Sequence, residues 1–354
     1  MKLESPAFQS ILTSELNTLV NIFNKYDHEL RIAGGAVRDL VLDMIPHDID
    51  FATTATPTQM KEMFNIEEIR MINDSGEKHG TITARINDKE NFEVTTLRID
   101  VVTDGRRAEV EFTKDWQLDA NRRDLTINAM FLGFDGTIYD YFNGVEDLKN
   151  RRVKFVGDPV SRIQEDYLRI LRYFRFYGRI AEKANDHEES TLNAIKENAS
   201  GMKIISGERI WMELKKILCG NHSGDILPTM LQLDLGPYMG LPDKADVEEY
   251  KTVCSLTEGL EPQPITRLVA LLANDEQVGR FMLRLDPQPM TRLVALLAND
   301  EQVHLLNRRI KLSRDELQLG SFIVNHRKDS FDNDPMRYCQ FLFTDSPGEK
   351  DKIN

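Results

Sequence analysis

The chain has 354 residues, 41% of them hydrophobic, and this length exceeds that of one typical domain. We therefore expect two or three folded units. No apolar run is long enough to span a bilayer, which argues against a membrane protein. The formal net charge of −13 argues against RNA binding by bulk attraction, because contacts to phosphates need a positive surface.

The cysteines give information about the compartment. Cys219, Cys254 and Cys339 are odd in number, lie far apart and form no C-x-x-C pair. This pattern favours a reducing compartment and argues against a disulfide framework or a zinc site.

The first motif that carries chemistry is the glycine pair Gly34 and Gly35. It lies between an apolar run at residues 30–33, typical of a strand, and an amphipathic segment at residues 36–42, typical of a helix. A strand-to-helix turn without Cβ atoms lets backbone N–H groups approach an anion closely. Arg38, one helical turn further on, could neutralise phosphate charge. The turn therefore predicts a site for the phosphates of a nucleoside triphosphate.

Two acids separated by one residue follow this turn. If Ile49 faces the core of a strand at residues 49–52, Asp48 and Asp50 both project to the opposite face. Paired carboxylates suit Mg²⁺, whereas we interpret the adjacent His47 as a polar neighbour, because Mg²⁺ prefers oxygen ligands. The alternative is a solvated acidic loop, since the pattern recurs at residues 332–334 without a glycine turn.

Four further motifs follow in chain order. They are Arg-Arg-Asp-Leu-Thr-Ile-Asn-Ala at 122–129, Asp-Tyr-Phe-Asn-Gly-Val-Glu-Asp-Leu at 140–148, Glu-Asp-Tyr-Leu-Arg-Ile-Leu-Arg at 165–172, and Ser-Gly-Glu-Arg-Ile-Trp-Met-Glu-Leu at 206–214. With the glycine turn and the acid pair, they resemble the motifs of class II tRNA nucleotidyltransferases. This family comprises CCA-adding enzymes and bacterial-type poly(A) polymerases, and the chain is most similar to the eukaryotic, organelle-type CCA-adding enzymes.

The resemblance implies a role for each motif. The motif at 122–129 looks like the ribose-binding motif, the motif at 140–148 like the hinge, and the motif at 165–172 like the base-selecting helix, which the motif at 206–214 braces. A third acid on a neighbouring strand completes the metal cluster in nucleotidyltransferases, and Glu93 is the candidate, because Phe92 and Val94 would point to the opposite, buried face. The alternative for Glu93 is an ordinary solvent-facing acid. The implied nucleotide-binding residues are Gly34, Gly35, Arg38, Arg123, Asp124, Asn128, Asp166, Arg169, Arg172 and Arg175.

The implied fold is an α/β nucleotidyltransferase head, a mixed sheet with helices, followed by an all-α neck, body and short tail. Strands are expected at residues 30–33, 49–52, 80–86, 92–99 and 129–132, helices at 36–42 and 57–64, and a mobile loop at 100–116. Helical periodicity replaces strand signals beyond residue 148. We therefore predict a head at 1–148, a neck at 149–215 and a tRNA-binding body and tail at 216–354.

The body and tail contain a near-identical repeat. Residues 262–278 recur at 287–303 with a single substitution, Met290 for Ile265. An offset of 25 residues and near-identity favour a recent local duplication or an assembly artefact over an ancient solenoid. Each copy is compatible with a short amphipathic helix.

Residues 149–179 are locally basic, with nine Lys or Arg against three acids. Arg169, Arg172, Arg175 and Arg179 recur at three- and four-residue spacing, so a helix would present them on one face, suited to nucleotide phosphate and tRNA. The interleaved aromatic residues are equally compatible with a helix core. For the arginines the alternative is a solvated face.

Base choice can be predicted from hydrogen-bond order. Asp166 offers an acceptor and Arg169 a donor, and at i and i+3 of one helix they would lie on the same face. This order complements the edge shared by cytosine and adenine, an amino donor beside a ring-nitrogen acceptor, and opposes uracil and guanine. The alternative is an ordinary intrahelical salt bridge.

The predicted function is template-independent addition of CCA to the 3′ end of tRNA, with CTP and ATP as substrates and Mg²⁺ as cofactor. The alternatives are a poly(A) polymerase of the same family, a CC-adding enzyme and a non-catalytic RNA-binding relative. An Arg-rich presequence is not evident, since Glu4 and Glu15 occur early, so mitochondrial, cytosolic and nuclear locations stay open. The sequence does not decide between monomer and homodimer.

Overall fold

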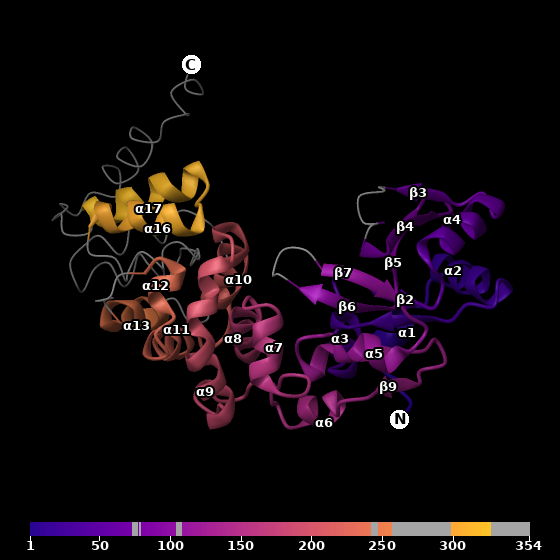
Figure 1. Cartoon of the computed structure of the whole chain (residues 1–354), viewed down its shortest axis with the longest axis horizontal. Coiled ribbons are helices and arrows are strands. Elements are labelled where there is room, and N and C mark those ends of the chain that lie inside the picture. Colours follow the sequence, from indigo (N-terminus) through magenta and orange to yellow (C-terminus); the bar gives the residue numbers. More distant parts are fainter. Residues whose placement is uncertain (73–76, 78, 104–107, 242–246, 257–298, 327–354) are drawn as a thin grey trace, which may run out of the picture. The chain divides into compact units, whose positions relative to one another are not determined.

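The structure is a computed structural model, and it describes residues 1–72, 77, 79–103, 108–241, 247–256 and 299–326. Residue contacts divide the chain into two compact units, Met1–Ile204 (unit 1) and Ile205–Asn354 (unit 2). All strands of the described residues belong to unit 1 (Figure 1). The repeat at 262–278 and 287–303 lies outside these residues except at its end, where Asp300–Ile310 forms helix α16.

Unit 1 is built on a seven-stranded mixed sheet with the strand order β3-β4-β5-β2-β1-β8-β9. Strands β2 and β5 are parallel, and the other neighbouring pairs are antiparallel. The N-terminal segment continues the edge at β9, where Lys2 bridges to Thr137 (Figure 1). The strands are β1 Leu30–Ala33, β2 Asp50–Thr53, β3 Arg70–Ile72, β4 Thr81–Ile86, β5 Glu90–Thr96, β8 Met130–Leu132 and β9 Ile138–Asp140.

Local sequence explains the elements that carry the site. Strand β1 and helix α3 (Gly35–Val41) flank the glycine turn as predicted, and α3 buries Val37 and Leu40. Helix α4 (Pro57–Ile66) starts at a capping box in which Thr56 and Gln59 exchange hydrogen bonds, with proline in the first turn. The helix start predicted there is confirmed.

The predicted mobile loop at residues 100–116 is wrong. Strands β6 (Arg98–Thr103) and β7 (Ala108–Phe112) form an antiparallel hairpin with a register shift between Asp100 and Val102, and helix α5 (Trp116–Asn121) starts after the N-cap Asp115. The predicted strand at 92–99 is likewise two strands, β5 and β6, separated at Leu97. The Ala-Glu-Val-Glu-Phe sequence of β7 does alternate, and its charged residues led us to predict a loop.

Helices form the rest of unit 1. Helix α8 packs four aromatic side chains in the core, among them Tyr173, which stacks on Phe155. The interpretation of these aromatics as core residues is confirmed. The remaining helices are α1 Pro6–Ser10, α2 Ser14–Lys25, α6 Gly144–Lys149, α7 Pro159–Glu165, α8 Arg169–Ile180 and α9 Glu189–Asn198, with short 3₁₀ helices at Thr126–Asn128 and Ala199–Ile204.

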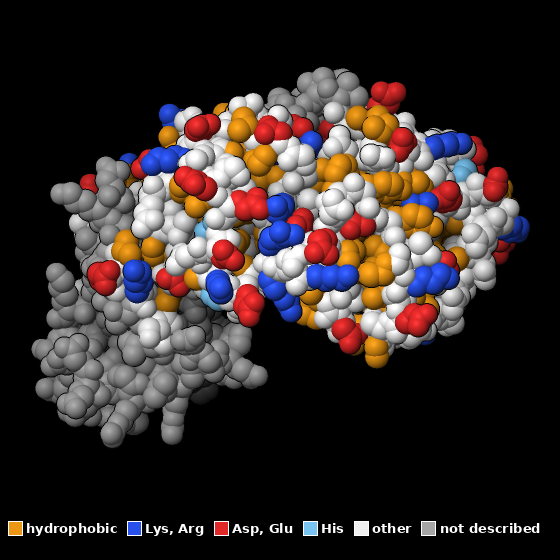
Figure 2. Space-filling model, turned by 90° about the horizontal axis from the view of Figure 1, so that it is seen from below, with side chains coloured by type: hydrophobic (Ala, Val, Ile, Leu, Met, Phe, Trp, Pro, Cys, Tyr) orange, Lys and Arg blue, Asp and Glu red, His pale blue; other side chains and the backbone are white. Residues whose placement is uncertain are grey.

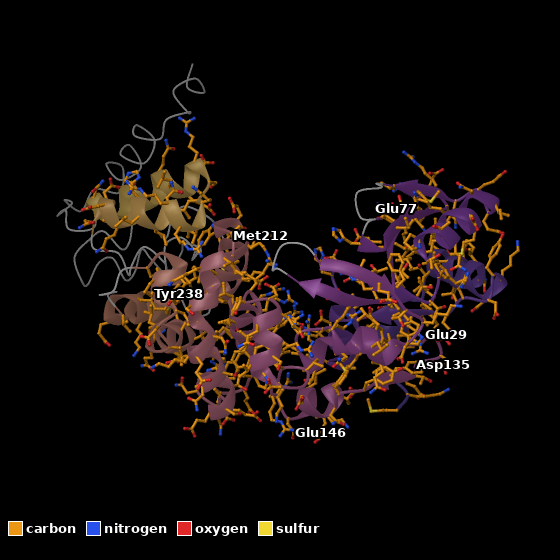
Figure 3. All side chains as sticks on the ribbon, viewed as in Figure 1. Glu29, Glu77, Asp135, Glu146, Met212 and Tyr238 are labelled. Atoms are coloured by element: carbon orange, nitrogen blue, oxygen red, sulfur yellow. The ribbon has the colours of Figure 1, made fainter. Side chains whose placement is uncertain are left out.

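The described part of unit 2 is helical. The indole N–H of Trp211 donates to the carboxylate of Glu316, and this contact joins α10 to α17. Met212 on α10 is 61% exposed at the surface (Figure 3). Among the described residues, no helix is both long and apolar enough to cross a membrane. The helices are α10 Gly207–Cys219, α11 Ser223–Gln232, α12 Gly236–Met239, α13 Val247–Leu256, α16 Asp300–Ile310 and α17 Arg314–His326.

Candidate active site

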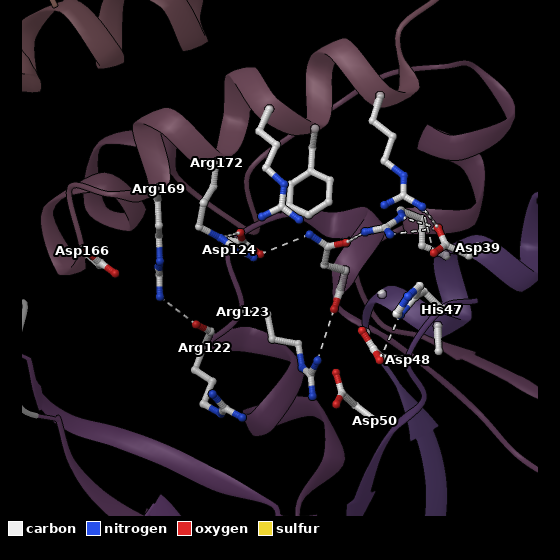
Figure 4. A pocket seen from close by; sticks show the side chains of 18 of the residues that line it. Asp39, His47, Asp48, Asp50, Arg122, Arg123, Asp124, Asp166, Arg169 and Arg172 are labelled. Carbon is white, nitrogen blue, oxygen red and sulfur yellow. Dashed lines mark hydrogen bonds and ion pairs between the residues drawn. The ribbon is translucent and has the colours of Figure 1, made fainter. Parts of the chain in front are cut away.

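A pocket of about 610 Å³ in unit 1 gathers all but one of the predicted site residues (Figure 4). Glu93 is the exception. The predicted residues that line the pocket are Gly34, Gly35, Arg38, Asp48, Asp50, Arg123, Asp124, Asn128, Asp166, Arg169, Arg172 and Arg175.

The glycine turn is shaped for close approach. Gly34 has φ +66°, a conformation that residues with a Cβ rarely adopt, and a Cβ at this position would lie 2.8 Å from Nη1 of Arg123. Nη1 of Arg123 also donates to the carbonyl of Asn128 at 3.3 Å. The turn therefore carries a guanidinium directly above it, at the place predicted for the phosphates of a nucleotide.

The acid pair lies beside this guanidinium. Asp50 opens strand β2, whereas Asp48 lies in the bend before the strand, so the prediction that both side chains alternate along one strand is only partly right. The Asp48 side chain is 87% exposed, and its Oδ1 lies 3.1 Å from Nδ1 of His47. Desolvation raises the pKa of Asp50, nearby Asp48 adds to the rise, and Arg123 opposes it.

Glu93 lies on the strand next to Asp50. The two residues are partners in the parallel β2–β5 register, so their side chains leave the sheet on the same face. Glu93 is exposed while Phe92 and Val94 are buried, as the alternation predicted. Neighbouring position supports Glu93 as a third acid, although it does not line the pocket.

The carboxylates of Asp48 and Asp50 fit a Mg²⁺ ion that is also bound by the phosphates of a nucleotide. Within the described residues, no group of three or more His, Cys, Asp or Glu side chains is close enough together to hold a metal ion by itself. Mg²⁺ usually keeps one or two carboxylates together with substrate phosphates and water. Asp48 and Asp50, open to the pocket, meet that requirement only when the phosphates of a nucleotide complete the shell.

A chain of polar contacts forms the back of the pocket. Arg38 donates from Nη1 to Oδ1 of Asn128 at 2.7 Å, Asn128 donates from Nδ2 to Asp124 at 3.5 Å, and Arg172 donates from Nε to Asp124 at 2.5 Å. Burial acts to raise the pKa of Asp124, but the guanidinium of Arg172 outweighs it and holds the pKa below its usual range. Arg38 is buried, its guanidinium donates to Asp39 and Asn128, and it also lines the pocket.

Some pocket residues were missed as site residues in the sequence. Asp39 accepts from Nε of Arg38 at 2.9 Å and from Nη2 of Arg179 at 3.0 Å, which ties α3 to α8. Arg122 and Phe176 also line the cavity. The three- and four-residue spacing of the α8 arginines had already placed Arg179 on the face predicted to bind phosphate, whereas no local pattern distinguishes Asp39 from an ordinary helix acid.

The predicted shared helix face of Asp166 and Arg169 is wrong. Helix α7 ends at Glu165, Asp166 is extended with φ −153° and ψ 106°, and α8 begins only at Arg169. The Asp166 carboxylate accepts from the backbone N–H of Leu168 at 3.1 Å. Because Asp166 turns the chain between two helices, it cannot be paired with Arg169 by helical spacing, yet both residues line the pocket.

The backbone N–H of Arg169 donates to the carbonyl of Asp166 at 2.9 Å, whereas its guanidinium bonds other residues. Its Nη1 donates to Glu165 at 2.6 Å and to the carbonyl of Arg162 at 3.1 Å, and its Nη2 donates to the carbonyl of Arg122 at 2.9 Å (Figure 4). These bonds fix the guanidinium at one end of the pocket, with the acid pair at the other.

The pocket is rich in charged side chains and, unlike the chain as a whole, has slightly more positive than negative ones. On the face in Figure 2, acidic and basic side chains are interspersed. The pocket instead gathers seven arginines against six aspartates. Arg175 lies over the ring of Phe176, with 4.8 Å between the guanidinium carbon and the ring centroid. Such a pocket suits an anionic ligand with a planar part.

A mixed sheet with a glycine turn and an acid pair at the same end of two neighbouring inner strands, β1 and β2, defines a nucleotidyltransferase head, and the comparisons with known proteins agree. The family described as "Poly A polymerase head domain" matches residues 30–154, and the family described as "Probable RNA and SrmB-binding site of polymerase A" matches residues 187–240. A Bacillus stearothermophilus CCA-adding enzyme, solved in complex with CTP, is similar in structure. Its TM-score is 0.67 at 26% identity, over 91% of this chain and 70% of that chain.

Similar proteins of named function show to which family of nucleotidyltransferases the chain belongs. The human "CCA tRNA nucleotidyltransferase 1, mitochondrial" is 56% identical over 98% of this chain and 75% of the relative. The zebrafish protein of the same name is 53% identical over 100% of this chain and 77% of the relative. The chain therefore belongs to the CCA tRNA nucleotidyltransferase family. The predicted fold class, family and enzyme class are confirmed.

Proposed function

We propose that the chain adds C, C and A in turn to the 3′ end of tRNA, using CTP and ATP and releasing pyrophosphate. The observation that carries the proposal is a single pocket holding the glycine turn, the acid pair and the arginines of α8. The human and zebrafish relatives, of whose length this chain covers 75% and 77%, bear the name of this activity, which adds support.

The reaction is attack of the tRNA 3′-hydroxyl on the α-phosphate of the nucleotide. Asp48 and Asp50 would hold Mg²⁺, with Glu93 beside Asp50 as the third acid. Bound Mg²⁺ supplies charge neutralisation at the triphosphate and lowers the pKa of the attacking hydroxyl. The protein groups contribute alignment of the reacting atoms and stabilisation of the charge that develops on the phosphate oxygens.

The remaining pocket residues are assigned to the triphosphate, the ribose or the base of the nucleotide. Arg123, which the sequence grouped with the ribose, is assigned to the triphosphate, because its guanidinium lies above Gly34 and beside Asp50. Asp124 and Asn128 are assigned to the ribose hydroxyls. The base is read at the other end, where Asp166 supplies an acceptor and Arg169 a donor. Arg172 and Arg175 complete the cationic wall of α8.

The other partners follow from the proposed reaction. The neck at 149–215 and the body and tail at 216–354 are proposed to bind the acceptor stem and 3′ end of tRNA. The human and zebrafish relatives are named mitochondrial, and we propose that compartment in preference to the cytosol or nucleus. A Thermotoga maritima CCA-adding enzyme has been solved with a tRNA, at 20% identity, a similarity that concerns the fold alone.

Incubation with labelled CTP separates the proposal from its nearest alternative. A tRNA lacking CCA, offered CTP and Mg²⁺ without ATP, should gain two C residues. A poly(A) polymerase of the same fold should add none, so absence of C incorporation by active protein would favour that alternative.

The raised pKa of Asp50 predicts a pH-dependent need for metal. Protons compete with Mg²⁺ for a carboxylate, and a raised pKa means that this competition begins at a higher pH than at an ordinary Asp. The Mg²⁺ concentration for half-maximal CMP addition should therefore begin to rise at a pH above the ordinary pKa of Asp as the pH is lowered. A requirement that is constant down to the ordinary pKa of Asp would contradict the assignment of Asp50.

Replacing the ribose partner should relax sugar selection. We expect Asp124→Ala to weaken the preference for CTP over dCTP, because a site built to bond a hydroxyl rejects an analogue that lacks it, and this rejection disappears with the bonding group. Loss of Asp124 also removes the partner of Arg172, so unfolding should be measured in parallel. An unchanged preference in a folded variant would assign Asp124 a purely structural role.

A further inference from the structure

One buried carboxylate behind the pocket has no role in the proposed chemistry. Asp119 on α5 is 1% exposed and is not among the residues that line the cavity. Its Oδ1 accepts from the backbone N–H of Arg98 at 3.1 Å and from Nε of Arg122 at 2.9 Å. Its Oδ2 accepts from Nε and Nη2 of Arg123 at 3.2 Å and 3.1 Å. Both oxygens are therefore used, mainly by two arginines of the pocket wall.

The bond pattern determines which way Arg123 faces. Asp119 takes the Nε and Nη2 edge of the guanidinium, which leaves Nη1 above the glycine turn and bonded to the carbonyl of Asn128. Without that edge contact, the long side chain would be free to populate other rotamers. The same carboxylate also accepts from the backbone N–H of Arg98, the first residue of β6, so Asp119 holds the start of the β6–β7 hairpin as well.

Asp119 is suited to this task because it stays ionised. Burial acts to raise its pKa, but Arg123 and Arg122 outweigh this effect and hold the pKa of Asp119 below its usual range. An ionised acceptor that binds the edge of a guanidinium restricts it more strongly than a neutral group does.

We propose that Asp119 is a positioning residue that holds Arg123 in the orientation in which it binds the triphosphate of the incoming nucleotide. The proposal rests on the proposed function in taking a nucleoside triphosphate as the ligand. It assigns Asp119 no contact with the nucleotide. Its effect should therefore appear in binding of the phosphates and not in binding of the base or ribose.

The test compares binding of CTP and CMP by calorimetry to the full chain and to Asp119→Asn. The amide keeps the shape but offers one acceptor, and its NH₂ group would face a guanidinium. We expect CTP binding to weaken by about tenfold or more and CMP binding to change by less than about twofold. A merely structural role would weaken both nucleotides equally or neither, and either result would overturn the proposal.

Asp115→Asn is the matched control. Asp115 is the N-cap of the same helix, and its carboxylate accepts from the backbone N–H groups of Gln117 and Leu118. Asn caps a helix about as well as Asp. This variant should bind CTP like the unmodified chain. If Asp119→Asn does not fold, Asp119→Glu keeps the charge but displaces the carboxylate by one methylene. An intermediate loss of CTP binding with CMP unchanged would then support the proposal, and CTP binding equal to that of the unmodified chain would overturn it.

Failure of this proposal can be distinguished from failure of the proposed function. If the unmodified chain bound CTP but added no C to tRNA, the proposed function would fail while the comparison of CTP with CMP still tested Asp119. If the unmodified chain added CCA and Asp119→Asn bound CTP normally, only the assignment of Asp119 would fail.

Discussion

Asp50→Ala should remove nucleotide addition while leaving the fold and tRNA affinity intact. Asp50 opens strand β2 on the wall of the pocket, so the substitution deletes the carboxylate proposed to hold Mg²⁺ and leaves the core unchanged. Loss of a carboxylate that would hold Mg²⁺ at the reacting phosphate should reduce transition-state stabilisation by several kcal/mol, which is at least about a thousandfold in rate. The measurement is single-turnover CMP addition with saturating Mg²⁺.

A surface acid provides the control for that experiment. Glu62 is exposed on α4, outside the pocket, and Glu62→Ala changes the net charge by the same amount. Its rate should equal that of the unmodified chain. Near-normal turnover by folded Asp50→Ala would show that the metal is held elsewhere.

Arg169→Ala should relax base choice more than it slows phosphoryl transfer. The substitution removes the donor assigned to the ring nitrogen of cytosine or adenine. It leaves Asp48 and Asp50, which lie at the other end of the pocket, unchanged (Figure 4). A hydrogen bond to a charged group contributes roughly 1.5–3 kcal/mol, so discrimination against UTP and GTP should fall by about one to two decades. The measurement is incorporation of each of the four nucleotides into a tRNA that ends before CCA.

Stability has to be followed in the same variant. Arg169 also bonds Glu165 and the carbonyls of Arg162 and Arg122, so the alanine should lower the melting temperature as well. Asp166→Ala should shift base choice in the same direction, and the double variant should lose less than the sum if the two act as one pair. Two single variants that keep normal base preference and lose only stability would reduce these residues to structural roles.

Short-range patterns predicted the elements around the glycine turn well. Gly34, the strand before it and the helix after it are determined by neighbouring residues, and the structure follows them closely. The β6–β7 hairpin was missed although its strands are neighbours in sequence, because charged residues at 100–116 are also typical of loops. Asp119 was missed because nothing in its sequence neighbourhood indicates that the fold will bury it behind two arginines.

The interruption between α7 and α8 shows where a periodic argument fails. Residues 165–172 have helical spacing, yet the chain becomes extended at Asp166, and its carboxylate caps the turn that follows. The interpretation of Asp166 and Arg169 as pocket residues survives because their neighbourhood in space is set by the fold, not by helical spacing. Sequence thus identified which residues line the pocket more reliably than it described how they are held.

The most direct measurement of the central claim is the sequence of the product. A tRNA lacking CCA is incubated with the chain, Mg²⁺ and an equal mixture of all four nucleoside triphosphates, and the new 3′ ends are sequenced. A pocket that selects C and A without a template should give ends that read CCA and extend no further. Ends that carry a run of A, or a mixture of all four bases, would contradict the account.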